Sequence, residues 1–324
     1  MRTMKVPEVK RLAEQRLVGA GLERSLAATL VDHMITADLW GRRSHGLSVR
    51  FPYVLSQAEK GAGRAQAEIA MDHGSAVLVD AKDGFGYAAG DFCTTLLVER
   101  AESHGLAVVS LINSRHTGML GYYAERAARS NVVTLLFSHC CPLMAPYGGT
   151  RALLGTNPLA FGFPFKPDPI IVDMATSALN YGDVLLRQSA GRKLPEGCAV
   201  DTDGRPTLDP GEAGKGALLP FGGHRGGALA LAVQVLSGIL TGASPIPPHG
   251  HEYGLLLIGM SKGLFAGESG YDEALEQLVA AYLSTPPIKG SVVRLPGSKR
   301  FENCRNGRKS GLEVSDELAK LLGL

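Results

Sequence analysis

Short apolar runs rich in β-branched residues alternate with longer segments of helical spacing, and this alternation limits the fold more than any other feature of the sequence. In one unit the spacing predicts a strand over Ser75–Asp80, a helix from about Ala88 to Ser103 and a strand over Leu106–Ile112. Strands and helices that alternate in this way are typical of α/β proteins. With 324 residues, 45% of them hydrophobic, the chain can bury a substantial core, and its length favours about two domains.

The same pattern extends over the rest of the chain. Helices are predicted from Val6 to about Leu22 and from Ser25 to about Leu39, and a shorter one over Val54–Glu59 after Pro52. Residues 187–216 are rich in Gly, Pro and charge and are predicted to form a long irregular insertion. Further strands are predicted at Val132–Ser138, Ile170–Asp173 and Gly254–Met260, and further helices at Tyr122–Arg129, Ala228–Leu240, Tyr271–Leu283 and from Ser315.

Charge balance and cysteine content exclude several classes of protein. The 33 Lys and Arg nearly balance the 31 Asp and Glu, so the chain lacks the basic surface of a dedicated nucleic-acid binder. The first residues contain no signal-like apolar run and no apolar stretch is long enough to span a bilayer, so we expect a cytoplasmic enzyme without a membrane partner. The five cysteines lack metal-ligand spacing, so we expect no metal site, and the adjacent Cys140 and Cys141 are expected to be reduced packing residues.

The segment Trp40–Tyr53 gathers a hydroxyl, an imidazole and several guanidinium groups between a helix and Pro52, a composition that core packing does not require. An imidazole has an unperturbed pKa near roughly 6.5, so His45 can exchange a proton at physiological pH with little perturbation. We therefore interpret Ser44-His45 as the proton-delivery site of a reductase. His33, inside the preceding helix, is interpreted as a structural histidine.

Two glycine-containing turns are candidates for phosphate binding. Gly84-x-Gly86-x-x-x-Gly90 departs from the dinucleotide-binding fingerprint, and an ordinary helix start explains these glycines at least as well. At the second turn, His116 and the amides of Thr117–Leu120 lie at a predicted helix N-terminus, where free N–H groups and the helix dipole favour an anion such as a pyrophosphate. An N-cap by Ser114 or Thr117 is the alternative, and both interpretations can hold together.

Seven short motifs occur in an order and spacing that resemble one family, the malate/L-lactate dehydrogenase-like NAD(P)-dependent oxidoreductases, which are unrelated to Rossmann-type lactate dehydrogenases. The motifs are Ser44-His45-Gly46, Ser114-Arg115-His116-x-Gly118, Pro146–Gly149, Gly155–Pro158, Asp173–Ser177, Leu218-Leu219-Pro220 and Gly222–Gly226. Five more resemble its Δ1-piperideine-2-carboxylate/Δ1-pyrroline-2-carboxylate reductase branch, whose members reduce a cyclic imino acid to L-pipecolate or L-proline with NADPH. These are Tyr181–Val184, Leu194–Gly197, Val200–Gly204, Leu219–Arg225 and Arg294–Gly297.

The resemblance implies an architecture and a partner. It implies an α/β protein with a non-Rossmann NAD(P)-binding domain, built on a mixed, largely antiparallel sheet, plus a helical domain. Residues 1–70 would form the helical domain that carries Ser44-His45, joined by the C-terminal segment 290–324. Residues 71–289 would form the NAD(P)-binding and substrate domain. Members of the family are typically homodimers, so the resemblance also implies a homodimer.

The resemblance further implies a set of site residues, of which the catalytic ones are Ser44, His45 and Asp183, with Asp183 stabilising the imidazolium. Arg50 would bind the substrate carboxylate, although the usual family arginine stands one position earlier, where this chain has Val49. The cofactor would be NADPH, with NADH possible, and Arg225 stands where lysine is usual. The implied cofactor-binding residues are His116, Thr117, Gly118, Met119, Leu120, Thr156, Asp173, Met174, Ala175, His224, Arg225 and Arg294.

Three alternatives stay open at this point. The nearest is a dehydrogenase of 2-hydroxy acids such as malate, lactate or ureidoglycolate, because C=O and C=N reduction need the same hydride and proton geometry. The second is a binding protein that has lost its chemistry, against which Ser44, His45 and Asp183 together argue. The third is a nucleic-acid binder, which only the charges from Arg294 to Arg308 favour. Within that segment, Arg294, Lys299 and Arg300 either reach the 2′-phosphate of the cofactor or form a solvated charge run.

Overall fold

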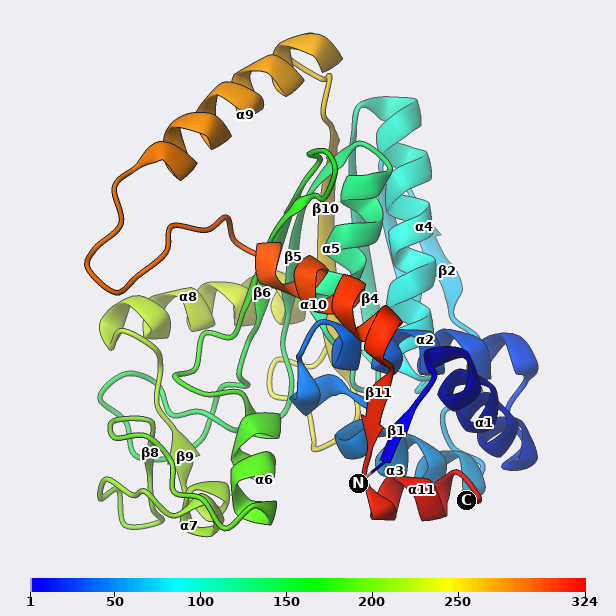
Figure 1. The fold of residues 1–324 in the computed structure, drawn as a ribbon, viewed down its shortest axis with the longest axis vertical. Coiled ribbons are helices and arrows are strands. Elements are labelled where there is room, and N and C mark those ends of the chain that lie inside the picture. Colours follow the sequence, from blue (N-terminus) through cyan, green and yellow to red (C-terminus); the bar gives the residue numbers. More distant parts are fainter. Residues whose placement is uncertain (1) are drawn as a thin grey trace.

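The computed structural model describes residues 2–324, and its centre is a seven-stranded sheet of order β2-β3-β4-β10-β5-β6-β7 (Figure 1). In this part of the chain only β3 and β4 run parallel, and every other neighbouring pair of the sheet is antiparallel. The predicted mixed, largely antiparallel sheet is therefore confirmed. The strands are β2 (Glu68–Asp72), β3 (Ala76–Asp80), β4 (Leu106–Ser114), β5 (Val132–Ser138), β6 (Leu159–Phe163), β7 (Ile170–Met174) and β10 (Tyr253–Ser261).

The sheet packs against two helices, α4 (Gly86–His104) and α5 (Leu120–Arg129), which lie side by side over it in Figure 1. Strand β10 pairs with β4 and β5 at the middle of the sheet, and its apolar run is buried almost throughout. Alternate residues of the neighbouring strands point into the same core, as the period of a strand requires. This core includes Val79, Leu97, Val109, Leu111, Tyr123, Leu136, Leu255 and Leu257.

The helices α1 (Val6–Gly19), α2 (Arg24–Leu39) and α3 (Leu47–Glu59) form a second body with its own buried core. The C-terminal part of the chain joins it, because β1 (Arg2–Met4) pairs with β11 (Leu312–Val314) and α11 (Asp316–Leu321) packs on α3. Helix α10 (Ser298–Ser310) contacts α2, and Figure 1 shows the two ends of the chain close together. The domain boundaries near residues 70 and 290 stay a prediction.

A smaller third body contains the segment predicted to be irregular. It is built from α6 (Tyr181–Ser189), β8 (Ala199–Val200), α7 (Pro210–Lys215), β9 (Ala217–Leu218) and the start of α8 (His224–Gln234). Within residues 187–216 the chain forms β8 and α7, so the prediction of a wholly irregular insertion is wrong. Helix α7 forms because Pro210 suits its first turn, and the Asp209 carboxylate accepts the N–H groups of Gly211 and Glu212.

Among the elements that differ from the predicted ones are α3, β2 and α8. Helix α3 begins at Leu47 and contains Pro52, whereas the sequence predicted a start at Val54, because the Asp38 carboxylate accepts the Leu47 N–H at 2.9 Å and caps the earlier turn. Strand β2 was not predicted since all its residues are exposed at the sheet edge. Helix α8 starts at His224, earlier than predicted, and continues into a π-helical turn at Val235–Ile239.

Helix α9 (Gly267–Ser284) projects away from the rest of the chain, and residues 285–297 return from it to α10 (Figure 1). Val279 is the one buried residue within this helix. Among residues 2–324 no helix combines the length and the apolar character that crossing a bilayer requires.

Asp38 provides a prediction about pH and stability. Burial raises the pKa of its carboxyl to about 7, with the Leu47 N–H and Arg43 opposing the shift. Because the folded-state pKa is raised, the stabilisation is complete below the unfolded pKa near 4 and is lost as pH rises through about 7. Asp38→Asn keeps an acceptor for Leu47 without the charge. From pH 5 to pH 8 we expect the free energy of unfolding of wild type to fall by about 2 kcal/mol relative to that of Asp38→Asn.

Urea unfolding followed by circular dichroism at pH 5 and pH 8 measures this difference. The exposed Asp203→Asn is the matched control. Its free energy of unfolding should differ from that of wild type by the same amount at both pH values. A pH-independent difference between wild type and Asp38→Asn would contradict a buried carboxyl that titrates in this range.

Candidate active site

A cavity of about 290 Å³ collects most of the site residues that the sequence predicted. Its walls come from the 3-10 turn Arg43–His45, from α3, from the N-terminus of α5, from the ends of β5 and β7, and from α6. The volume is close to the lower end of the range for small-molecule sites. The predicted residues that line it are Ser44, His45, Arg50, His116, Thr117, Gly118, Met119, Leu120, Thr156, Asp173, Met174 and Ala175.

His45 is a neutral imidazole at the centre of this cavity. Its ring lies parallel to that of His116, with 5.8 Å between ring centroids and 22° between ring planes. Burial lowers the pKa of His45 well below 6.5, and the positive charge of Arg50 lowers it further. The pKa of His45 thus lies below the unperturbed value from which the interpretation of the sequence started. The His45 Nδ1 atom is buried and has no hydrogen-bond partner in the described structure, which is unusual for a buried polar atom.

His116 is held in one tautomer by its neighbours. Its Nδ1 accepts the Gly118 N–H at 3.1 Å and lies 3.2 Å from the Tyr87 hydroxyl. A neutral imidazole that accepts at Nδ1 carries its proton on Nε2. Burial lowers the pKa of His116 well below its ordinary value, so this donor is also uncharged. Tyr87 was not predicted to belong to the site, and no local signal in the sequence marked it.

His33 fixes the loop that leads into α5, as expected of a structural histidine. It is fully buried, and its Nε2 accepts the Met119 N–H at 2.8 Å. Gly118 has a φ of +77°, and a Cβ there would collide with the His33 ring. The amides of Gly118 and Met119 are therefore already occupied, and the Gly121 amide donates to Asp173. The sequence predicted that the amides of Thr117–Leu120 are free to bind an anion. This prediction is wrong for the amides of Gly118 and Met119.

Arg50 and Ser44 are linked through the backbone. The Arg50 Nε donates to the Ser44 carbonyl oxygen at 3.0 Å, which places the guanidinium beside the Ser44-His45 turn. Gly182 of α6 packs on the same turn, since a Cβ there would lie 2.7 Å from the Ser44 Cβ and 3.4 Å from the Arg50 Nη2. Val49 also lines the cavity. Helix α3 thus presents both Val49 and Arg50 to the cavity, where the family arginine was expected.

Asp183 is close to this turn but does not line the cavity. It follows Gly182 in α6, and its Oδ2 accepts a long hydrogen bond, 3.4 Å, from the Asn180 side chain. Within residues 2–324 no hydrogen bond joins Asp183 to His45 in the ligand-free protein. Asn180 and Tyr181 line the cavity in its place, although neither was predicted to be a site residue. The role of Asp183 as a partner for His45 stays a prediction.

A second, basic cavity of about 470 Å³ adjoins the first, and Arg42 lines both. Arg294, Lys299 and Arg300 also line the second cavity. Arg300 is not part of a solvated charge run, because it is 5% exposed and its guanidinium lies 4.8 Å from the centroid of the Trp40 ring. Its Nη1 atom lies 3.9 Å from the Asp173 carboxylate. His224 and Arg225, at the exposed start of α8, line neither cavity, so their predicted contact with the cofactor stays a prediction.

The site also contains groups that sequence reasoning did not assign to it, chiefly Cys141, His249 and Tyr253. Cys141 was expected to be a packing residue, yet it lies on the cavity wall. His249 lies in the loop that contains the Pro-rich segment Ser244–Pro248, and Tyr253 begins strand β10, which follows this loop. Only the fold brings these two residues to Cys141. Among the described residues no cluster of three or more His, Cys, Asp and Glu could hold a metal ion.

The comparisons with known proteins agree with this architecture. The family described as malate/L-lactate dehydrogenase matches residues 4–322. A (2R)-3-sulfolactate dehydrogenase (NADP(+)) from Chromohalobacter salexigens is 36% identical over 97% of this chain and 95% of its own length. A Δ1-pyrroline-2-carboxylate/Δ1-piperideine-2-carboxylate reductase from Pseudomonas putida is 34% identical over 94% and 92%. The solved sulfolactate dehydrogenase from Methanocaldococcus jannaschii superposes with a TM-score of 0.90 at 30% identity, covering 99% of this chain and 95% of its own.

The fold and these matches define an NAD(P)-dependent oxidoreductase. The chain belongs to the malate/L-lactate dehydrogenase family.

The residues present fit a nicotinamide dinucleotide. His45 and His116 line the first cavity, and the buried His45 Nδ1 lacks a hydrogen-bond partner in the described structure. Arg300 keeps a buried Nη1 without a hydrogen-bond partner in the described structure, close to the N-terminus of α5. Arg42 and Arg294 supply cations in the adjoining cavity, which is the chemistry that phosphate groups require.

Gly118 provides a prediction that separates backbone strain from the His33 contact. Gly118→Ala should destabilise the fold by about 2–4 kcal/mol, because it adds a strained φ and pushes His33 from the Met119 amide. Gly148 also has a positive φ, +81°, but a Cβ there meets no atom within 4 Å. The control Gly148→Ala should therefore cost only about 1 kcal/mol. Urea unfolding measures both, and equal losses would contradict the proposed importance of the His33 contact.

Proposed function

We propose that this protein is an NADPH-dependent reductase of cyclic imino acids, which converts Δ1-pyrroline-2-carboxylate to L-proline and Δ1-piperideine-2-carboxylate to L-pipecolate. The observation that carries the proposal is the composition of the cavity beside His45. Arg50 supplies one cation there, while Val49, Tyr53 and Leu185 supply largely apolar surface. A cyclic imino acid has one carboxylate and an apolar ring, and this arrangement matches both parts.

Val49 also argues against substrates with two anionic groups. Malate and sulfolactate carry a second carboxylate or a sulfonate, which needs a second cation in the same pocket. The position at which the family usually has an arginine holds Val49 in this chain. Arg50, one position later, supplies a single cation in its place. Arg42, the other arginine on the cavity wall, also lines the basic cavity and lies where it can serve the cofactor.

The protein supplies orientation and a proton, since the bound NADPH supplies the hydride to the carbon of the C=N bond. Arg50 holds the substrate carboxylate by charge-assisted hydrogen bonds. Because Arg50 is one of the charges that lower the pKa of His45, a carboxylate on Arg50 offsets that charge and raises the pKa of His45 again. Substrate binding therefore favours proton uptake by His45, which then holds the proton beside the substrate nitrogen.

Ser44 and Asp183 complete the proposed proton site. Ser44 is 4% exposed and lines the cavity directly before His45. Asp183 follows Gly182, which packs against Ser44, and in the proposed mechanism its charge favours the imidazolium once His45 is protonated. We assign Asp183 this electrostatic role and no direct contact with the substrate.

NADPH is the proposed cofactor because the second cavity is strongly basic. Arg42, Arg294 and Lys299 converge on it, and a 2′-phosphate adds the charge that such a cluster attracts. The name of the relative from Chromohalobacter salexigens also includes NADP(+).

A 2-hydroxy acid dehydrogenase is the second candidate, and the neutral state of His45 favours it. A neutral imidazole is the form that accepts the proton of a hydroxyl group as its carbon loses a hydride. The two candidates share the same hydride and proton geometry and differ only in the substrate heteroatom.

A homodimer is the proposed assembly. Helix α9 and its flanking segments expose large apolar side chains, with Phe265 90%, Leu278 62% and Ile288 83% exposed. Apolar area gathered on one projecting element is typical of a protein–protein interface. A second copy of this chain would cover it.

Rates of NADPH and NADH oxidation with four substrates side by side test the proposed function. These are Δ1-pyrroline-2-carboxylate, Δ1-piperideine-2-carboxylate, pyruvate and oxaloacetate. We expect the highest kcat/KM for the two imino acids with NADPH, and the lowest for the dianionic oxaloacetate. Activity confined to the keto acids would establish the dehydrogenase instead.

His45→Ala should lower turnover by about a hundred- to ten-thousandfold, which is the usual contribution of a general acid. NADPH affinity, measured by fluorescence titration, should change little because the imidazole serves the proton and not the phosphates. The exposed His73→Ala is the control and should behave like wild type. Wild-type turnover in His45→Ala would remove His45 from the mechanism.

Light scattering after size-exclusion chromatography tests the assembly. We expect twice the chain mass for wild type. We expect a shift toward the single-chain mass for Leu278→Lys, because a charge would be buried in the interface. The control Lys320→Glu, on the opposite body of the protein, should keep the dimer. A wild-type protein that elutes at the single-chain mass would contradict the proposal.

A further inference from the structure

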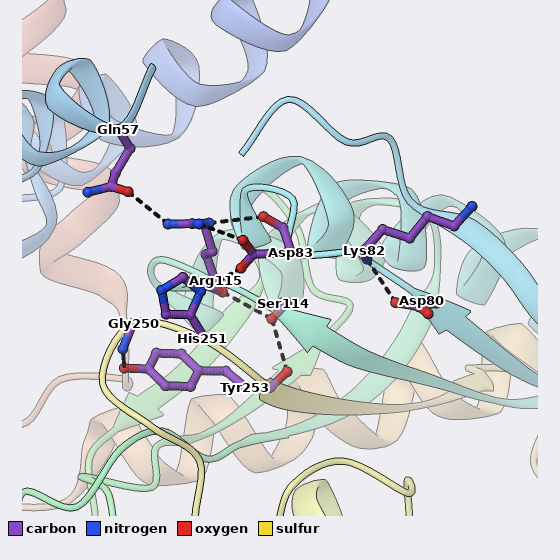
Figure 2. A network of polar contacts seen from close by, with 9 residues as sticks. All are labelled: Gln57, Asp80, Lys82, Asp83, Ser114, Arg115, Gly250, His251 and Tyr253. Carbon is purple, nitrogen blue, oxygen red and sulfur yellow. Dashed lines mark hydrogen bonds and ion pairs between the residues drawn. The ribbon is translucent and has the colours of Figure 1, made fainter. Parts of the chain in front are cut away.

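A network of polar contacts ties down the loop that carries His249 (Figure 2). His251 Nδ1 lies 2.7 Å from the Asp83 carboxylate, which also binds the Arg115 guanidinium at 2.5 Å. The Arg115 Nη1 in turn donates to Gln57 of α3 at 2.8 Å. On the other side of the turn, the Gly250 N–H donates to the Tyr253 hydroxyl at 2.8 Å. Residues 249–253 are thus anchored on both sides.

This anchored loop places His249 against a cysteine on the cavity wall. The His249 Nδ1 lies 3.2 Å from the Cys141 Sγ, although the two residues are 108 positions apart in the sequence. Both side chains line the cavity, and so does the adjacent Cys140. His249 is exposed while Cys141 is only 4% exposed, so a molecule reaches the sulfur through the cavity.

The surroundings of Cys141 favour the thiolate. A hydrogen bond from the Cys140 thiol lowers the pKa of Cys141 to about 5 against the opposing effect of burial, and the side chains of Tyr253 and His249 lower it further. Burial has the opposite result at Cys93 and Cys198, whose pKa values are raised. The other charged or titratable groups around the cavity are His45, His116, Arg42, Arg50, Asp173 and His139, the last bonded to the Ser244 carbonyl.

We propose that Cys141 is a nucleophilic thiolate that small hydroperoxides oxidise inside the active-site cavity. The sulfur attacks one oxygen of the peroxide, so that an S–O bond forms and the O–O bond breaks. The sulfur loses two electrons and becomes a sulfenic acid. The leaving oxygen is reduced to a hydroxyl group and takes the proton that His249 donates. The reaction consumes one hydroperoxide and releases one alcohol or water.

Two features define the product and the reagent. Consecutive Cα atoms are about 3.8 Å apart, which is closer than the usual separation in an unstrained disulfide. Cys140 therefore serves as the hydrogen-bond donor, and the oxidation stops at the sulfenic acid. The low exposure of Cys141 restricts the reagent to small uncharged molecules such as hydrogen peroxide.

Alkylation by iodoacetamide tests whether the thiolate exists. The rate at each cysteine is read from the mass of its peptide, so the result does not depend on the proposed reductase activity. An ordinary thiol reacts about a hundredfold more slowly at pH 6 than at pH 8, because its thiolate fraction falls. The alkylation rate of Cys141 should fall by less than about threefold from pH 8 to pH 6. Cys198 in the same sample is the internal reference for an ordinary or raised pKa.

His249→Asn tests the partner. We expect it to slow the alkylation of Cys141 at pH 6 by about tenfold while leaving the rate at pH 8 nearly unchanged. The control His104→Asn, at an exposed helix end, should leave the whole profile unchanged. A hundredfold loss of the Cys141 rate at pH 6 in wild type, or an unchanged profile in His249→Asn, would overturn the proposal.

Treatment with hydrogen peroxide followed by dimedone tests the oxidation itself. The dimedone mass should be found on the Cys141 peptide of wild type and be absent in Cys141→Ser. Cys140→Ala should reduce the labelling, because the thiol donor is lost. Labelling on Cys304 or Cys198 in preference to Cys141 would contradict a specific site.

Discussion

The site depends on an imidazole that is buried beside a guanidinium without a carboxylate partner. Desolvation and the charge of Arg50 both disfavour the imidazolium of His45, so the ligand-free protein holds it neutral. Such an arrangement stores an electrostatic cost that a bound anion relieves. In the proposed mechanism, a substrate carboxylate bound to Arg50 therefore raises the proton affinity of His45, so that the substrate promotes the protonation of its own proton donor.

The surrounding structure keeps this arrangement in place through buried polar contacts rather than through apolar packing alone. His33 and Gly118 set the loop before α5, Asp38 caps α3 and thereby orients Arg50, and Gly182 of α6 closes on Ser44. The His33 contact joins the helical body to the sheet, the Gly182 contact joins it to the third body, and the Asp38 contact lies within the helical body. The cavity thus exists only where the three bodies meet, and none of them carries it alone.

Sequence reasoning located the parts of the site that lie in one polar segment or directly after a strand. Ser44 and His45 were found because polar residues between a helix and a proline have no role in core packing, whereas the role of Arg50 came from the resemblance to a family. His116 was found because it follows a strand and precedes a helix. The mixed sheet came from the resemblance to a family, since the glycine-rich turn at Gly84–Gly90 on its own suggested a different fold.

The rest of the site could not be read from the sequence for physical reasons. The contact of Cys141 with His249 spans 108 residues and depends on how a loop is anchored by His251 and Asp83. The state of His45 depends on burial, which no local pattern reports. Helix α6, which carries Asp183, was not predicted, and the structure shows no contact between Asp183 and His45 among the described residues, because the direction of a side chain on a short helix follows from packing.

The coupling between Arg50 and His45 can be measured directly by titrating ¹⁵N-labelled His45 by NMR, with and without a planar ring carboxylate such as pyrrole-2-carboxylate. We predict that the pKa of His45 lies well below 6.5 in the free protein and rises when the carboxylate binds. We further predict that the rise is lost in Arg50→Gln. A pKa of His45 that stays the same with and without the bound carboxylate would contradict the central claim that substrate binding turns His45 into the proton donor.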